Sequence, residues 1–262
     1  MKSTQPLVLD QEDRQDINDL DALVIRKDPP FDKSYLHLTY LLEFLSDNVL
    51  QINPPAALRD VNEKLYTLNW PDHCPDTLVS CDRQTLMEFA GRHKKIVLKP
   101  LDDCSGRGIR FIEGSGVDEG EIIGDMLQAE GYVMAQAFLT GVRQGDKRVY
   151  LVAGKPVAWV NRVPAQGSDL ANIHQGAICE PAELTDVERH ISEVVGQDLV
   201  SRDIMLAGLD FIDGRLTEIN VTSPSALRQI NQVTRGHAER AVVDAILERI
   251  AQEECSRASV VA

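Results

Sequence analysis

An Asp-Gly dipeptide at positions 213–214 constrains the fold of this chain more than any other feature of its sequence. Alternating apolar residues flank it on both sides, in GLDFI before the dipeptide and RLTEINV after it. Asp-Gly between two such runs is the strongest short-range signal for a β-hairpin. Residues 208–221 are therefore predicted to form an antiparallel pair of strands.

Three side chains with oxygen atoms fall on this predicted hairpin. Glu218 and Asn220 are two residues apart, so they point to the same face of one strand. The turn folds the strand of Asp210 back beside them, and we expect the three to converge. Two carboxylates and an amide oxygen suit Mg²⁺, with Mn²⁺ as an alternative ion. The solvent face of an ordinary hairpin has the same pattern, and both interpretations stay open at this point.

The remaining sequence alternates short apolar runs with amphipathic stretches, which is typical of a mixed α/β protein. The further expected strands are Ala22–Ile25, Val49–Asn53, Thr77–Ser80, Lys95–Pro100, Gly108–Ile112 and Tyr132–Phe138, and a second hairpin turns at Gly154–Lys155. The expected helices cover about Lys33–Leu45, Ala57–Trp70, Arg83–His93, Asp118–Glu130, Thr185–Ser201 and Gly236–Glu253.

Composition excludes several classes of partner. The formal net charge of −14 argues against nucleic acid, because neutralising phosphates requires clustered Lys and Arg. No apolar run is long enough to cross a bilayer, so no membrane partner is expected. The five cysteines are an odd number without zinc-ligand spacing, and the N-terminus lacks the apolar core of a secretory signal. These features predict reduced thiols and a cytoplasmic protein.

A second candidate site follows the expected strand Lys95–Pro100. Lys99 lies at the end of that strand, and the loop after it contains Gly106 and Gly108. Backbone N–H groups of such a loop and a lysine can hold phosphate together. A plain hairpin loop explains the same residues. The sequence has no Walker A motif and no helix-opening GxGxxG, which disfavours a P-loop NTPase and a Rossmann enzyme. Lys64 falls on an expected amphipathic helix, where a lone lysine usually faces solvent.

Five segments occur in a fixed order: NEKLYT, KIVLKPLD, YVMAQAFL, GDKRVYLVAGKPV and GLDFIDGRLTEINVTSP. With RKDPPFD and LRDVNEKL upstream, they closely resemble the bacterial glutathione synthetase family of the ATP-grasp superfamily, from about residue 19 onward. The resemblance implies an α/β protein with the ATP-grasp fold, built from α+β subdomains. It divides the chain into a truncated N-terminal substrate domain (1–62), a lid subdomain (63–138) and a metal-binding subdomain (139–262). Family members carry a βαβ unit before the segment that matches here, so we expect the N-terminal domain to lack about two strands and a helix.

The implied reaction is an ATP-dependent ligation of a small amino-acid or peptide carboxylate to an amine. It passes through an acyl phosphate and releases ADP and phosphate, with γ-glutamylcysteine and glycine as the default substrates. A homo-oligomer is expected. The alternatives are an ATP-grasp ligase or kinase with a different substrate, and an ATP-binding partner without turnover.

The resemblance also implies roles for individual residues. It assigns ATP to Lys64, Lys99, Ser105, Gly106, Gly108, Gln136, Ala137, Phe138, Leu139 and Asp146, with 136–139 reading adenine and Asp146 facing the ribose. It assigns magnesium to Asp210, Glu218 and Asn220. It assigns the phosphoryl and acyl groups to Arg148, Arg162 and Asn172, and substrate contacts to Arg26, Ser223 and Pro224.

One loop departs from the family pattern. In GSDLANIHQGAICEP, Leu170 and Ile178 stand where the family carries arginines, while Asn172 is retained. Two lost cations should weaken the capture of an anionic substrate. His174 in the same loop either compensates in part or is an ordinary surface histidine. We therefore expect a ligase with intact ATP sites and altered substrate specificity.

Overall fold

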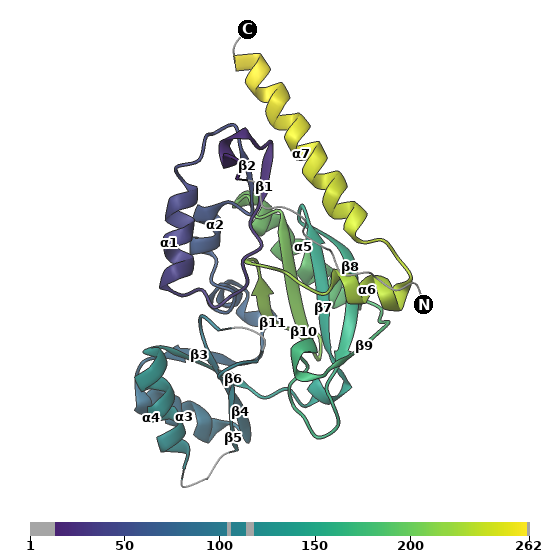
Figure 1. Cartoon of the computed structure of the whole chain (residues 1–262). Coiled ribbons are helices and arrows are strands. Elements are labelled where there is room, and N and C mark those ends of the chain that lie inside the picture. The colour runs from purple at the N-terminus through teal and green to yellow at the C-terminus, as the bar shows by residue number, and fades with distance from the viewer. Residues whose placement is uncertain (1–13, 104–105, 114–117, 261–262) are drawn as a thin grey trace.

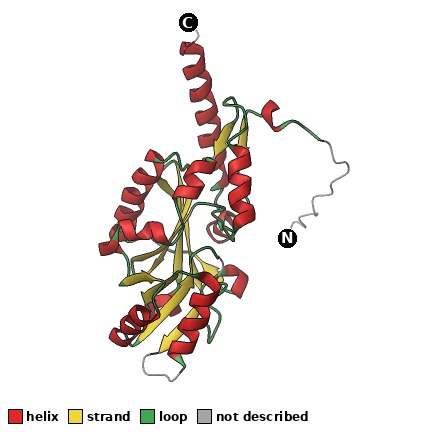
Figure 2. Cartoon of the chain, turned by 90° about the vertical axis from the view of Figure 1, so that its left-hand side faces the viewer, coloured by secondary structure: helices red, strands yellow, loops and turns green. Residues whose placement is uncertain are grey.

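The computed structural model of the chain describes residues 14–103, 106–113 and 118–260, and it contains three sheets flanked by helices (Figures 1 and 2). The sheets pair strands β1 with β2; β3, β6, β4 and β5; and β11, β10, β7, β8 and β9. This mixed architecture agrees with the fold class expected from the sequence.

The N-terminal sheet is a parallel pair, β1 (Ala22–Val24) and β2 (Leu50–Ile52). Helices α1 (Lys33–Leu42) and α2 (Pro55–Asp60) accompany it, and Asp32 caps α1 by accepting a 2.8 Å hydrogen bond from the Tyr35 amide. The last helix, α7 (Glu239–Val260), runs past this strand pair in Figure 1. One apolar cluster includes Val24, Leu50 and Ile52 of the strands with Val242, Ala245 and Ile246 of α7.

The second sheet is antiparallel, with β3 (Thr77–Ser80), β6 (Val133–Ala137), β4 (Lys95–Pro100) and β5 (Arg110–Glu113) in that order. Helices α3 (Arg83–Arg92) and α4 (Glu119–Glu130) pack on it. Along β4, Ile96 and Leu98 are fully buried in the core shared with these helices. Because side chains alternate along a strand, Lys99 points to the opposite face.

The third sheet consists of β11 (Arg215–Asn220), β10 (Leu206–Ile212), β7 (Asp146–Val152), β8 (Lys155–Val163) and β9 (Ile178–Glu180). Helices α5 (Asp186–Ser201) and α6 (Leu227–Thr234) pack against β8. Both predicted hairpins form. Asp213 and Gly214 have φ values of 52° and 70°, as the Asp-Gly turn requires. The other turn lies at Ala153 and Gly154, one residue earlier than expected.

The prediction of one continuous helix over Ala57–Trp70 is wrong. Helix α2 ends at Asp60, and a separate 3₁₀ turn, η2 (Leu65–Asn69), follows. Between them the Asn62 side-chain oxygen accepts hydrogen bonds from the amides of Lys64 (3.1 Å) and Leu65 (3.0 Å). Local side-chain acceptors of this kind compete with helical hydrogen bonds. The carbonyl of Glu63 accepts instead from Ile219, so this segment is joined to β11.

Within the part of the chain that the structure describes, no helix is both long enough and apolar enough to span a membrane.

Candidate functional site

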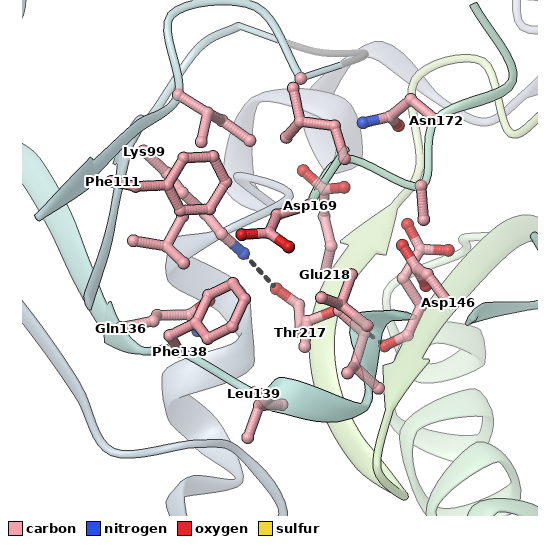
Figure 3. A pocket seen from close by; sticks show the side chains of 18 of the residues that line it. Lys99, Phe111, Gln136, Phe138, Leu139, Asp146, Asp169, Asn172, Thr217 and Glu218 are labelled. Carbon is pink, nitrogen blue, oxygen red and sulfur yellow. Dashed lines mark hydrogen bonds between the residues drawn. The ribbon is translucent and has the colours of Figure 1, made fainter. Parts of the chain in front are cut away.

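A pocket of about 830 Å³, counting space open to solvent, lies between the second and third sheets. Figure 3 shows Phe111, Gln136 and Phe138 on one side of it and Asp146 and Asn172 on the other. Residues of β4, β5, β6, β7, β10 and β11 line it, together with residues of the connecting segments such as Lys64, Gly106 and Asp169. The site is therefore built by the facing surfaces of two sheets.

Two lysines enter this pocket from different segments. Lys99 Nζ is 3.5 Å from the carbonyl oxygen of Thr217, and burial lowers the pKa of its ammonium, with Lys64 adding to the effect. Lys64 is only 4% exposed, which corrects the expectation that it faces solvent. Its ammonium donates to the carbonyl of Asp103 at 2.5 Å and lies 3.3 Å from Glu218 Oε1. Two cations thus converge beside one carboxylate, where phosphate groups would be attracted.

The apolar part of the pocket is made by the end of β6. Gln136, Ala137, Phe138 and Leu139 all line it, as the resemblance implied for an adenine site. The Phe138 ring lies 5.9 Å from the Phe111 ring, edge to face. Residues 137–139 leave β6 toward the third sheet, so this segment connects the two halves of the pocket.

The glycine loop contributes less than expected. Gly106, with φ of 76°, lines the pocket, while Gly108 does not. A Cβ on Gly108 would lie 2.9 Å from Pro100, so that glycine serves local packing. Ser105 lies outside the described residues.

Asp210 is held by two buried arginines. The Arg148 guanidinium donates two hydrogen bonds to it, from Nε to Oδ1 at 2.5 Å and from Nη2 to Oδ2 at 2.9 Å. Arg162 Nη2 lies 2.9 Å from Oδ1, and Asn220 donates to Oδ2 at 3.2 Å. Burial alone would raise the pKa of Asp210, but the two arginines outweigh it and hold the pKa below its ordinary value. Since Asp210 is only 3% exposed, the interpretation of a plain solvent-facing hairpin is wrong at this position.

The oxygen atoms around Asp210 can be compared with the ligands that a divalent cation requires. Each Asp210 oxygen already has two contacts, which is about the capacity of a carboxylate oxygen. Glu218 faces the pocket, and Asp146 Oδ1 is buried with no hydrogen-bond partner. Burial raises the pKa of Asp146 to about 6, against the opposing charge of Arg162. No three His, Cys, Asp or Glu side chains among the described residues form a metal cluster. These hard oxygens fit Mg²⁺ if Asp210 exchanges one of its present contacts for the ion and if Asn220 and phosphate oxygens complete its shell.

Glu63 is a buried residue of the site that the sequence did not reveal. Its Oε1 accepts hydrogen bonds from the amides of Val221 (2.9 Å) and Thr222 (3.0 Å) and from the Thr222 hydroxyl (2.8 Å). Burial, followed by the nearby Glu218 charge, raises the pKa of Glu63. The side chain therefore anchors the loop that leads to Ser223.

A second cavity of about 1400 Å³, also open to solvent, adjoins the first. Glu218 and Asn172 line both, so the cavities meet there. The second cavity is further lined by Arg148, Arg162, Glu63, His174 and Ser223. It combines cationic and hydroxyl groups that suit a small polar substrate with a carboxylate.

The other residues that were expected to contact substrate, Pro224 and Arg26, do not line the two cavities. Pro224 is buried and lines neither cavity. Arg26 is exposed, interacts with the Tyr150 hydroxyl and is also outside both linings. Leu170 lines the first cavity, whereas Ile178 is 66% exposed on β9 and lines neither. Of the two positions at which the family pattern carries an arginine, 170 therefore lines the first cavity and 178 lines neither.

Comparison with known proteins gives the following matches. Residues 63–235 match the family described as prokaryotic glutathione synthetase, ATP-grasp domain, and residues 2–59 match its N-terminal domain. The glutathione synthetase of Nitrosomonas europaea is 39% identical over 240 residues, covering 90% of this chain and 75% of that protein. The glutathione synthetase of Escherichia coli K12 is 38% identical over 239 residues, with the same coverage.

Solved structures share the fold at low sequence identity. D-cycloserine synthetase DcsG has a TM-score of 0.70 at 15% identity, covering 92% of this chain and 87% of that chain. D-alanine–D-alanine ligase from Bacillus anthracis complexed with ATP has a TM-score of 0.63 at 13% identity, covering 91% and 82%. These structures share the fold of the chain, and the matched family domain identifies it as ATP-grasp.

Proposed function

The chain belongs to the prokaryotic glutathione synthetase family, and on that premise we propose how its residues carry out the reaction and on which substrates. It is an ATP-dependent carboxylate–amine ligase with the ATP-grasp fold, and neither a kinase that stops at phosphoryl transfer nor a partner without turnover is favoured. One observation carries the assignment of roles: Lys64 approaches Glu218 to 3.3 Å, at the point where the two cavities meet, with Lys99 in the same pocket.

ATP occupies the first cavity in this proposal. Residues 136–139 and Phe111 enclose the adenine, and Asp146 faces the ribose. Lys64, Lys99 and the backbone at Gly106 hold the phosphates, which places the γ-phosphate beside Glu218. Phosphoryl transfer depends mainly on such positioning and on neutralising charge.

Asp210, Glu218 and Asn220 are proposed to hold Mg²⁺, with Asp146 Oδ1 as a further oxygen nearby. When bound, the ion supplies Lewis-acid polarisation and charge neutralisation at the phosphate oxygens. The residues themselves orient the reacting groups. Asp210 fixes Arg148 and Arg162, and the two guanidinium groups face the second cavity, where the substrate carboxylate attacks the γ-phosphorus.

The second half of the reaction is the attack of an amine on the acyl phosphate, with loss of phosphate. Ser223 and Asn172 line the cavity in which both substrates meet, and Glu63 keeps the Ser223 loop in place. Arg26 and Pro224 line neither cavity, so we propose a supporting role for them, Pro224 in the loop of Ser223 and Arg26 beside Tyr150. We propose a lid subdomain at 63–138 and a metal-binding subdomain at 139–262, after a truncated N-terminal substrate domain at 1–62. The reduced-cysteine pattern supports a cytoplasmic location.

We propose γ-glutamylcysteine and glycine as the default substrates, used with reduced efficiency. The support is Leu170, which lines the first cavity where the family pattern carries an arginine. Arginine gives a carboxylate or phosphate charge-assisted, often bidentate hydrogen bonds, about twice as strong as neutral ones. An aliphatic side chain at this position gives no such bonds, so the acyl phosphate, which forms where the two cavities meet, is less stabilised.

A coupled ADP-release assay tests the substrate proposal. With γ-glutamylcysteine and glycine, kcat/KM is expected to lie more than about tenfold below that of the E. coli enzyme assayed in parallel, a loss of at least ~1.4 kcal/mol in transition-state binding. Leu170→Arg should recover part of the difference. A wild-type kcat/KM within tenfold of the reference would overturn the altered specificity and leave an ordinary glutathione synthetase.

A further inference from the structure

A cluster of three charged residues joins separate segments beside the nucleotide pocket. Lys95 Nζ lies 2.7 Å from Asp169 Oδ2, and Arg143 Nε lies 3.4 Å from Asp169 Oδ1. Lys95 is on β4, Arg143 is on the 3₁₀ turn η4 (Thr140–Gln144), and Asp169 is in the loop between β8 and β9. One carboxylate therefore connects the second sheet, the segment after β6 and a loop of the third sheet.

Lys95 also contacts the aromatic side of the pocket. Its ammonium lies 4.3 Å from the centre of the Phe138 ring and 5.0 Å from that of Phe111, within the range of cation–π attraction. Glu113 is a competing partner at 2.9 Å, but its side chain is 73% exposed and that of Asp169 only 18%. The hydrogen bond from Lys95 holds the pKa of Asp169 below its ordinary value. Of the two carboxylates that pair with Lys95, Asp169 is thus the more buried.

The loop that Asp169 anchors covers part of the pocket. Asp169, Leu170, Ala171 and Asn172 all contribute to its lining, and Asp169 stands near the centre of Figure 3. The Asn172 amide packs so closely on Gly106 that a Cβ there would be 2.8 Å from Nδ2. Residues 169–172 therefore reach from the aromatic side of the pocket to the phosphate loop.

We propose that Asp169 is a positioning residue that holds the loop 164–177 closed over bound nucleotide and thereby sets the rate of nucleotide release. The inference rests on the proposed function, in that it requires a nucleotide in this pocket. The loop must separate from Lys95 and Arg143 before a ligand beneath it can leave. Ion pairs between partly exposed groups contribute modestly, so two of them predict an acceleration of about threefold to tenfold when they are removed.

The test is release of mant-ADP from the full chain with Mg²⁺, chased with excess unlabelled ADP in a stopped-flow instrument. Asp169→Asn removes both ion pairs and should release the nucleotide about threefold to tenfold faster than wild type, whereas Lys95→Met removes one pair and should give a smaller acceleration. Since both variants remove the same contact, the double variant should release it no faster than the faster single variant. Lys94→Met is the matched control, because Lys94 is the exposed neighbour of Lys95, and it should behave as wild type.

Salt dependence separates an electrostatic contact from a packing defect. Release from wild type should accelerate as ionic strength rises, because salt screens partly exposed pairs, and Asp169→Asn should respond less. Release rates within twofold of wild type in both single variants, or fully additive effects in the double variant, would overturn the proposal. A wild-type protein that binds no mant-ADP would instead overturn the proposed function. Normal binding with unchanged release overturns the role of Asp169 alone.

Discussion

Glu218 lies where the two cavities meet, with its carboxylate 3.3 Å from Lys64 Nζ. Replacing Glu218 with Gln keeps the size of the side chain and removes one charged oxygen ligand. Turnover at saturating Mg²⁺ is expected to fall by at least ~10²-fold, because charge stabilisation by a metal is worth several kcal/mol. Steady-state ADP release measures the effect. Glu130→Gln, at an exposed helix end, is the control, and wild-type turnover of the Glu218 variant would exclude the metal assignment.

Lys99 provides a separate test of phosphate binding. Because Lys99 points away from the helices of its own sheet and into the pocket, Lys99→Met removes a charge from the site without opening that core. ATP should bind at least about tenfold more weakly, the scale of one charge-assisted contact, while adenosine should bind almost unchanged. Isothermal calorimetry with both ligands makes the comparison. Equal losses for the two would mean that Lys99 acts through folding of the pocket.

The sequence revealed some site residues and concealed others for a physical reason. Asp210, Glu218 and Asn220 were found because strand periodicity and one turn place them on the same face. Glu63 could not be found in this way, since its partner amides are 158 and 159 residues further along the chain. The pairing of Lys95 with Asp169 likewise spans 74 residues. Contacts of this length depend on how sheets pack, which no local pattern encodes.

The same distinction holds for whole elements. Both hairpins were predictable because turn chemistry and alternation lie within a few residues, and β3 and β4 have the expected bounds. The helix expected through residues 57–70 failed because Glu63 and Ile219 join this segment to β11. Strand β9 was missed because its residues, Ile-Cys-Glu, form no apolar run such as the ALVI that indicated β1. Ile178 and Glu180 are exposed, so no buried face marks the strand in the sequence.

Helix α5 packs so closely on the β7–β8 turn that a side chain cannot fit between them. A Cβ at Gly196 would lie 2.1 Å from the carbonyl oxygen of Gly154. Although alanine favours helices, Gly196→Ala is expected to lower the free energy of unfolding by about 1–3 kcal/mol through overpacking. The midpoint and slope of urea unfolding give this value.

Gly124 in α4 is the matched control, because nothing lies within 4 Å of an added Cβ. Gly124→Ala should raise the free energy of unfolding by about 0.5–1 kcal/mol, since glycine is a poor helix former. A Gly196 variant as stable as the Gly124 variant would show that α5 can move away from the turn at no cost.

At the scale of the whole molecule, α7 holds residues near both ends of the described chain together. Ile246 belongs to the apolar cluster with Val24 and Ile52, while its neighbour Leu247 is 58% exposed. Ile246→Asp should lower the free energy of unfolding by at least about 2 kcal/mol, because it places a charge in that cluster. Leu247→Asp loses at least as much helix propensity but leaves the charge in solvent, and it should cost less than about 1 kcal/mol. Urea unfolding measures both variants, and equal losses of unfolding free energy would show that Ile246 does not pack in this cluster.

Because α7 shares an apolar cluster with the first two strands, the order of synthesis affects when this part of the protein can fold. A ribosome releases β1 and β2 long before it releases Val242, Ala245 and Ile246, which share their apolar cluster. Until then Val24, Leu50 and Ile52 have an incomplete core. The hairpins of the third sheet, by contrast, need only neighbours already synthesised. The N-terminal strand pair, although translated first, therefore completes its packing only after α7 has been released.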